Sequence, residues 1–110
     1  MLVKVPKEIQ VGCHKYKICF SEAQEEDGHN ATTNNYSRTI RINPHLKGRG
    51  SYLDVVFLHE LVHAIGRIYP DVDIPEDDVE GLSQGLGQVF FSGLGIELDW
   101  SGIPTMKEVE

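Results

Sequence analysis

Two histidines with a glutamate beside the first carry the clearest chemical signal in this sequence: His59, Glu60 and His63, set in the otherwise apolar stretch 57–65. On an α-helix, residues four apart project from one face, roughly 6 Å from each other. Two imidazoles with that spacing can point at one metal ion, at about 2.0–2.1 Å if it is zinc. Glu60 lies about 100° further round, within reach of a metal-bound water. The pattern His-Glu-x-x-His predicts a zinc peptidase site.

The motif is short, so a chance match has to be considered. In a chain of this length and composition, an accidental match is expected about 0.02 times. The apolar flanks add weight, because a catalytic helix must bury its sides while one polar stripe faces a cleft. The alternative interpretation is an ordinary amphipathic helix whose histidines are solvated or hydrogen-bonded.

The length and charge of the chain limit the functions to be considered. Its 110 residues suffice for a single domain, 1–110, and its 40% hydrophobic and 25% charged content is ordinary for a globular protein. A net charge of −7 argues against nucleic-acid and anionic-membrane partners, because their phosphate groups would repel it. No apolar run approaches the ~20 residues of a membrane span, and residues 1–7 lack the apolar core of a signal peptide. We therefore expect a cytoplasmic protein; the sequence leaves its oligomeric state open, and a monomer is compatible with it.

Cys13 and Cys19, with His14 next to the first, are the two cysteines of the chain. In the cytoplasm they would stay reduced, and buried thiols are common in protein cores. A second metal site made from these three residues is the alternative, although their spacing fits no familiar zinc pattern.

The first half of the chain predicts β-structure. Residues 2–5 and 9–20 alternate apolar and polar side chains, with a change of parity that predicts a turn or bulge within the second segment. Residues 21–35 are polar and rich in turn formers, which predicts a loop. Residues 36–43 alternate again and predict another strand. That strand is either purely structural or a sheet edge to which an extended substrate adds its backbone.

The second half predicts two helices, at about 52–69 and about 75–94. Apolar residues recur at helical spacing through the first, which carries both histidines and is stopped by a proline. Pro75 suits the first position of the second helix, and the acids at 76–78 complement its dipole. Strands followed by helices predict an α+β fold, with a sheet of about three strands packed on both helices and a tail at 96–110.

Two stripes run along the predicted second helix. The apolar positions follow helical spacing and are expected in the core: Val79, Leu82, Leu86, Val89, Phe90 and Leu94. The other stripe holds Glu80, Ser83, Gln84 and Gly87, flanked by Gly81 and Gly85. Three glycines inside a helix cost on the order of 1 kcal/mol each relative to alanine, which close packing against another helix would offset. We expect that neighbour to be the histidine-bearing helix, so that Glu80 approaches the metal as a third ligand.

Catalytic zinc normally has three protein ligands and one open position, and two extensions of the motif compete for the third ligand. Residues 59–66, which end with Gly66 three residues after His63, match the first part of the metzincin pattern. That pattern then requires histidine or aspartate three residues later, where this sequence has Tyr69. The gluzincin arrangement takes a glutamate from a following helix, which Glu80 can supply. If Glu80 does not bind the metal, the acids to test next are Asp71, Asp73 and Asp77.

On these residues the sequence resembles the very small gluzincin-type metallopeptidases, including ImmA/IrrE-like proteins often found in phage and prophage contexts. The resemblance covers roughly residues 36–94 and rests on the strand before the helix, the His59-Glu60-x-x-His63 motif and Glu80. It implies one Zn²⁺ per chain between two helices, with His59, His63 and Glu80 as ligands, and a peptide or protein substrate.

The predicted chemistry is hydrolysis of peptide bonds by a metal-activated water. The metal lowers the pKa of its water toward about 7, and Glu60 as general base takes the proton and passes it to the leaving amine. A donor that stabilises the oxyanion is also expected, with Tyr36, Tyr52 and Tyr69 as candidates. Two other interpretations stay open: a metal-binding regulatory or partner-binding protein with weak or latent catalysis, and a structural domain without metal.

Overall fold

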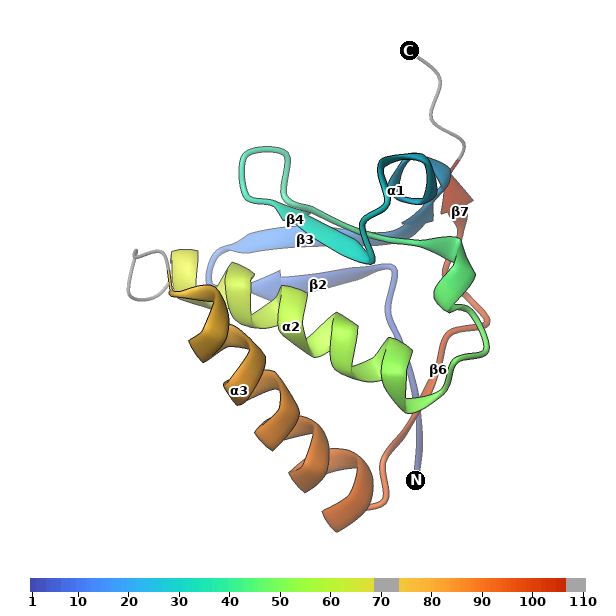
Figure 1. Cartoon of the computed structure of the whole chain (residues 1–110), viewed down its shortest axis with the longest axis vertical. Coiled ribbons are helices and arrows are strands. Elements are labelled where there is room, and N and C mark those ends of the chain that lie inside the picture. The colour runs from blue at the N-terminus through green and yellow to red at the C-terminus, as the bar shows by residue number, and fades with distance from the viewer. Residues whose placement is uncertain (69–73, 107–110) are drawn as a thin grey trace.

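The computed structural model describes residues 1–68 and 74–106. They form an α+β fold in which a mixed sheet, the long helix α2 and the outer helix α3 make successive layers (Figure 1). The elements in chain order are β1 (Leu2–Lys4), β2 (Glu8–Val11), β3 (His14–Ser21), α1 (Glu22–Asp27), β4 (Ala31–Asn34), β5 (Thr39–Ile42), η1 (Pro44–Leu46), α2 (Ser51–Ile68), α3 (Glu76–Gly87), η2 (Gln88–Gly93), β6 (Glu97–Asp99) and β7 (Thr105–Met106). The predicted fold class is therefore confirmed.

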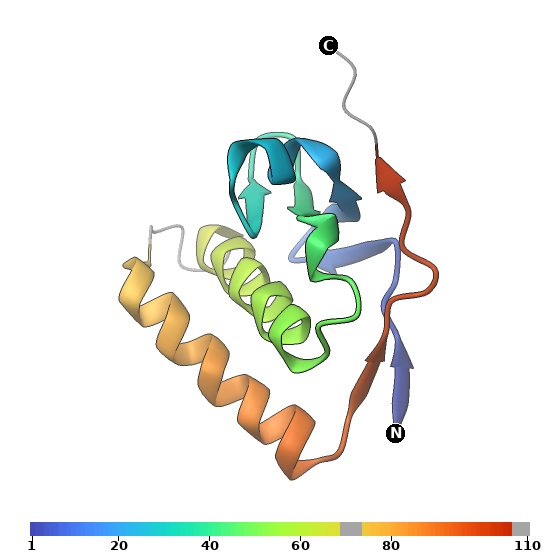
Figure 2. The same ribbon diagram turned by 45° about the vertical axis from the view of Figure 1, so that its right-hand side comes forward.

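The main sheet has five strands rather than the three expected, in the order β2-β3-β5-β4 with β7 also pairing β3. β2 and β3 are antiparallel, β3 runs parallel to β5, and β4 is antiparallel to β5. A separate two-stranded parallel sheet joins β1 to β6, so that the first and last parts of the described chain lie side by side (Figure 2). The extra strands are short, and their polar sequences carry little alternation.

The predicted strands at 2–5 and 9–20 correspond to β1, β2 and β3. The change of parity marks the turn between β2 and β3, where Gly12 has a φ of 63° that favours glycine. Beyond that turn Tyr16, Ile18 and Phe20 are fully buried, as their alternation predicts. The turn therefore lets both strands present apolar side chains to one core.

The loop predicted at 21–35 is wrong. Its first part forms the short acidic helix α1, and its second part forms β4, whose Thr33 pairs with Ile40 of β5. The polar side chains misled the prediction, because β4 is only four residues long and lies at an end of the sheet order, beside a cleft. Threonine suits a strand in such a half-exposed place.

The strand predicted at 36–43 is the shorter β5, and Ile40 and Ile42 are completely buried within it. Tyr36 belongs to the preceding turn, where Asn34 Oδ1 accepts hydrogen bonds from the backbone of Tyr36 and Ser37, and its side chain is 96% exposed. Because β5 lies between β3 and β4, it offers no edge to a substrate. The interpretation of this strand as a substrate-binding edge is therefore wrong. β4 occupies the edge.

Helix α2 matches its prediction closely and buries its apolar side against the sheet. Leu53, Phe57 and Ala64 belong to the hydrophobic core with the side chains of β3 and β5. Trp100, just after β6, packs edge-on against Phe57 and donates a hydrogen bond from Nε1 to Asp54 Oδ1 at 2.9 Å. These contacts hold the C-terminal strands against the start of α2.

Helix α3 begins at Glu76, directly after Pro75, and continues without a break into the π-helix η2. It packs on α2 through Val79, Ser83 and Gly87, which are buried. The expectation that Leu82, Leu86, Val89 and Leu94 form core is wrong, because all four are exposed. No second layer covers the outer side of α3 in Figure 2.

The three glycines of α3 have different surroundings. A Cβ added to Gly87 would lie 3.1 Å from Val55 Cγ2 on α2, so the expected close approach of the two helices holds there. A Cβ added to Gly81 or Gly85 would meet nothing within 4 Å. The packing explanation is therefore wrong for these two glycines, which lie on the open side.

Two remaining expectations concern the cysteines and the membrane. Cys19 is buried on β3 and Cys13 is exposed at the turn before it, without a disulfide between them.

Within residues 1–68 and 74–106, no helix has the length and apolar character that a membrane crossing requires.

Candidate metal centre

The two histidines of the motif lie on the face of α2 that meets α3. Their ring centroids are 4.9 Å apart with the rings inclined at 64°, so both imidazoles turn toward the same space. The side chain of His59 is 15% exposed and that of His63 is 30% exposed. The one-turn spacing seen in the sequence therefore produces a pair of partly accessible ring nitrogens.

Glu76, the first residue of α3, faces both histidines. Its Oε2 lies 2.7 Å from His59 Nε2, and its Oε1 lies 3.1 Å from His63 Nε2. One ligand atom from each of these three residues lies within 4.8 Å of the other two, which makes them a group that could hold a metal ion. The sequence interpretation missed Glu76, because an acid in the first turn of a helix is already explained by the helix dipole.

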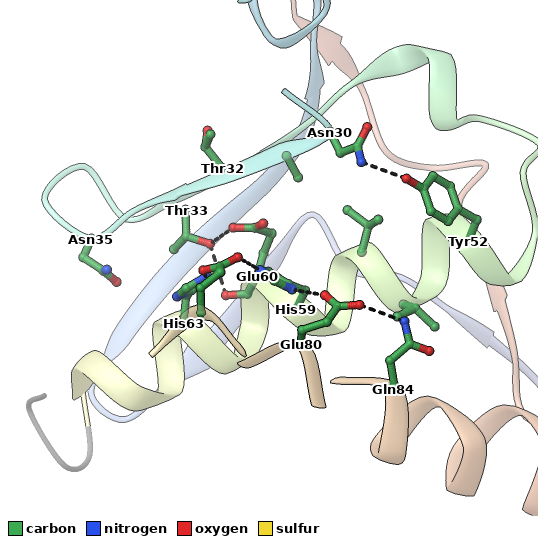
Figure 3. Close-up of a pocket in the computed structure, with 14 residues that line it drawn as sticks. Asn30, Thr32, Thr33, Asn35, Tyr52, His59, Glu60, His63, Glu80 and Gln84 are labelled. Carbon is green, nitrogen blue, oxygen red and sulfur yellow. Dashed lines mark hydrogen bonds and ion pairs between the residues drawn. The ribbon is translucent and has the colours of Figure 1, made fainter. Parts of the chain in front are cut away.

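Glu80 approaches His59 from the other side of the ring. Its Oε1 lies 2.9 Å from His59 Nδ1, and its Oε2 accepts a hydrogen bond from Gln84 Nε2 at 2.9 Å (Figure 3). The hydrogen bond from Gln84, and then that from His59, hold the pKa of the Glu80 carboxyl below its usual range. The assignment of Glu80 as a metal ligand stays a prediction; in this arrangement its carboxylate contacts the imidazole nitrogen that points away from Glu76.

The carboxylate of Glu60 is almost completely buried, with 6% of the residue exposed. Burial raises its pKa, while a hydrogen bond from Thr33 and the neighbouring His59 and His63 partly lower it. Thr33 Oγ1 lies 2.6 Å from Glu60 Oε1 and 3.1 Å from the Glu60 carbonyl oxygen. Since a hydroxyl has one proton, the shorter contact to the carboxylate is the main hydrogen bond. Thr33 was missed because its segment was assigned to a loop.

A cleft of about 520 Å³ opens between β4 on one side and α2 and α3 on the other. It contains both histidines and all three glutamates of this region, together with polar residues of β4 (Figure 3). At one end Asn30 Nδ2 donates a hydrogen bond to the Tyr52 hydroxyl oxygen at 2.8 Å. Of the three candidate tyrosines, Tyr52 lines the cleft, Tyr36 is not among the lining residues, and Tyr69 lies outside the described residues.

The donor set fits zinc. Two imidazole nitrogens and one carboxylate oxygen are the ligands of many catalytic zinc sites, which keep a fourth position for water or substrate. Here the three donors face a cleft rather than a closed core, so a fourth position would be accessible. Of the other acids considered from the sequence, Asp77 is exposed on α3, and Asp71 and Asp73 lie outside the described residues.

Comparisons with known proteins add no family to this picture. No family model, curated protein or solved structure matches the chain. The resemblance to gluzincins therefore rests on sequence residues alone, and the assignment to a peptidase family is a matter for proposal.

Proposed function

We propose that this protein is a zinc-dependent peptidase with one Zn²⁺ per chain. The observation that carries the proposal is the buried carboxylate of Glu60, next to the group formed by His59, His63 and Glu76, in a cleft bordered by an edge strand. A structural domain would have little reason to bury a carboxylate beside two histidines, since burying a charge is costly unless it is paired.

In this proposal His59, His63 and Glu76 hold the metal, and Glu80 fixes the orientation of His59. When bound, zinc supplies Lewis-acid chemistry: it lowers the pKa of a coordinated water and polarises a carbonyl. A histidine ligand commonly donates its second ring N–H to a carboxylate, which fixes its tautomer, and the contact between His59 Nδ1 and Glu80 suits that role. The sequence-based alternative, with Glu80 as ligand, exchanges the roles of the two glutamates.

Glu60 acts as the general base. Its Oε1 accepts the hydrogen bond from Thr33, which leaves Oε2 to take a proton from water and return it to a leaving amine. Because burial raises its pKa, this carboxyl is a better proton acceptor than an exposed glutamate. Thr33 holds the carboxylate in position and keeps its pKa from rising further.

The substrate is a peptide or a protein in extended form. β4 lies at the edge of the sheet, above the cleft, and its backbone pairs with β5 on one side only. An extended peptide can add to such an edge by main-chain hydrogen bonds, which would bring a peptide bond over the metal group. A net charge of −7 makes nucleic acid and anionic membranes less favourable partners than a peptide.

The test is Glu60→Gln, measured with a mixed peptide library and mass spectrometry. Glutamine keeps the size of the side chain and its hydrogen bond from Thr33, so we expect stoichiometric zinc and an unchanged fold. Cleavage should fall by about 10²–10⁴-fold, the usual contribution of a general base. Wild-type cleavage by this variant would refute the role of Glu60, and wild-type protein without zinc would refute the metal centre.

A catalytically weak regulatory protein that binds metal is the second candidate. The observation in its favour concerns the oxyanion: of the candidate tyrosines only Tyr52 lines the cleft in the described chain, seven residues or about 10 Å along the helix from His59. Stoichiometric zinc without turnover of any library peptide, together with a stable protein complex, would favour this function over hydrolysis.

A further inference from the structure

The outer side of α3 and η2 carries exposed apolar residues that no described element covers. We define the α3 apolar face as Leu82, Gly85, Leu86 and Val89, which recur at helical spacing on one side. Leu82 is 51% exposed, Leu86 37% and Val89 54%. On a helical wheel Leu82 and Leu86 lie about 200° and 240° from Glu80, so this face points away from the metal group.

The face is uncharged over a long stretch. From Gly81 to Ile96 the sequence has no acidic or basic residue, in a chain whose overall charge is −7 and whose charged content is 25%. Solvent-exposed helix surfaces normally carry charges, which keep them soluble. The absence of charge over sixteen successive positions therefore marks a surface suited to burial.

Exposed apolar side chains continue beyond the helix, next to one positive charge. The N-terminal ammonium of Met1 donates a hydrogen bond to the Gly95 carbonyl at 2.8 Å, which places β1 next to the end of η2 (Figure 2). Leu94 is 62% exposed, Met1 74% and Leu2 66%. Taking roughly 200 Å² for a fully exposed large side chain, these three and the leucines and valine of the α3 apolar face offer about 700 Å². That exceeds the ~300–600 Å² of the largest apolar patch on a typical monomer and approaches the ~800 Å² per partner of a standard interface.

We propose that a second copy of this chain covers the α3 apolar face, in a two-fold symmetric pair of α3 helices. In an isologous pair the same patch meets itself, so a charge at its centre would oppose its own copy. The α3 apolar face carries no charge, and the N-terminal ammonium lies beyond it, at Gly95. The acidic excess of the chain lies in residues 51–110, and within them the uncharged stretch 81–96 can meet its own copy without repulsion between carboxylates. Gly85 has open space where a side chain would be, which lets two helix backbones approach closely.

A membrane surface suits this face less well than a second copy. The first turn of α3 carries three acids, Glu76, Asp77 and Asp78, and no basic residue flanks the apolar positions. Helices that lie in a membrane surface usually carry lysine and arginine, which attract anionic lipids. The charge of this helix therefore favours a protein copy.

The experiment measures molar mass by light scattering and sedimentation from about 1 µM to about 500 µM. We expect a monomer–dimer equilibrium that Val89→Asp and Leu82→Asp each weaken by more than about a hundredfold, because symmetry places two like charges in the interface. Tyr36→Asp is the matched control, since Tyr36 is 96% exposed at a distant turn and adds the same charge. A wild-type monomer at every concentration would overturn the proposal, as would monomers whose binding to phosphatidylcholine vesicles is lost in Val89→Asp.

Gly85→Leu tests the close approach of the helices. The added side chain meets nothing within 4 Å in the monomer, so the fold and zinc content should be unchanged. In the dimer it would separate the two backbones, and we expect at least a tenfold weaker association. A Gly85→Leu protein that dimerises as tightly as wild type would overturn the pairing through α3. Since neither readout depends on zinc or hydrolysis, the result is independent of the proposed peptidase.

Discussion

Helix α3 has two sides that differ in composition and surroundings. On the side nearer α2, Val79, Ser83 and Gly87 are buried against that helix, and Glu76, Glu80 and Gln84 lie next to them at the cleft. The outer side is apolar and exposed. In an ordinary amphipathic helix the apolar side faces the core and the polar side faces solvent. In α3 the polar side is exposed as usual, but only a narrow strip with Val79, Ser83 and Gly87 is buried, so that much of the apolar side is exposed too.

The packing of α3 on α2 explains how so narrow a contact can be stable. Small buried residues let the two backbones approach, so that Val79 and the backbone around Gly87 bury apolar area despite the polar stripe. The cleft side then needs no apolar residues, because its polar groups bond to one another, as Glu80 does to Gln84 and His59. The residues of the outer side do not belong to the metal group, and changes there should not affect it.

The largest expected effect is that of Glu76→Gln on the cleft side. Loss of a carboxylate ligand should weaken zinc binding by at least about a thousandfold, because an amide is a much poorer ligand for zinc. Competition with a chromogenic chelator measures the affinity directly. Asp77→Asn is the control, since Asp77 carries the same charge on the next residue but does not line the cleft.

Glu80→Gln should have a smaller effect, about 10–100-fold in zinc affinity, as is usual for a carboxylate that orients a histidine ligand. The same competition assay applies. The informative result is which of the two substitutions, Glu76→Gln or Glu80→Gln, causes the larger loss of zinc affinity. A larger loss in Glu80→Gln than in Glu76→Gln would restore the sequence-based assignment, with Glu80 as the third ligand.

Two glycine substitutions compare the sides of α3 in stability. Gly87→Leu should destabilise the protein by about 1–3 kcal/mol, because its Cβ would already lie 3.1 Å from Val55 Cγ2. Gly85→Leu should stabilise the monomer by up to about 1 kcal/mol, since it removes a glycine from a helix and meets no obstacle. Urea unfolding, at a protein concentration where both variants are monomers, measures whether each substitution raises or lowers the free energy of unfolding. Equal destabilisation by both would contradict the described packing.

The smallest expected effect comes from β4, across the cleft from α3. Thr33→Val removes the hydrogen bond that lowers the pKa of Glu60, so that pKa should rise further above its usual range. A base with a higher pKa stays protonated to a higher pH. The acid limb of the plot of kcat/KM against pH should therefore shift to higher pH. Thr32→Val is the control, because Thr32 points away from Glu60 in Figure 3. If the acid limb does not shift, the hydrogen bond from Thr33 does not control the pKa of Glu60.

The sequence alone predicted the parts of this protein that depend on local spacing. The His59–His63 pair follows from the pitch of a helix, the limits of α2 from its apolar stripe, and the α+β class from strands preceding helices. The turn near Gly12 followed from a change of parity along one segment. Each of these rests on residues close together in the chain, where helix and strand geometry fix the outcome.

Only the tertiary structure decided which distant groups meet. Glu76 and Glu80 are one turn apart on the same face, so the angle and register at which α3 crosses α2 determine which carboxylate meets which ring nitrogen. Thr33 reaches Glu60 only because β4 adds to the sheet beside α2. The exposure of Leu82 was beyond the sequence too, since helical periodicity identifies an apolar side but not the surface that covers it.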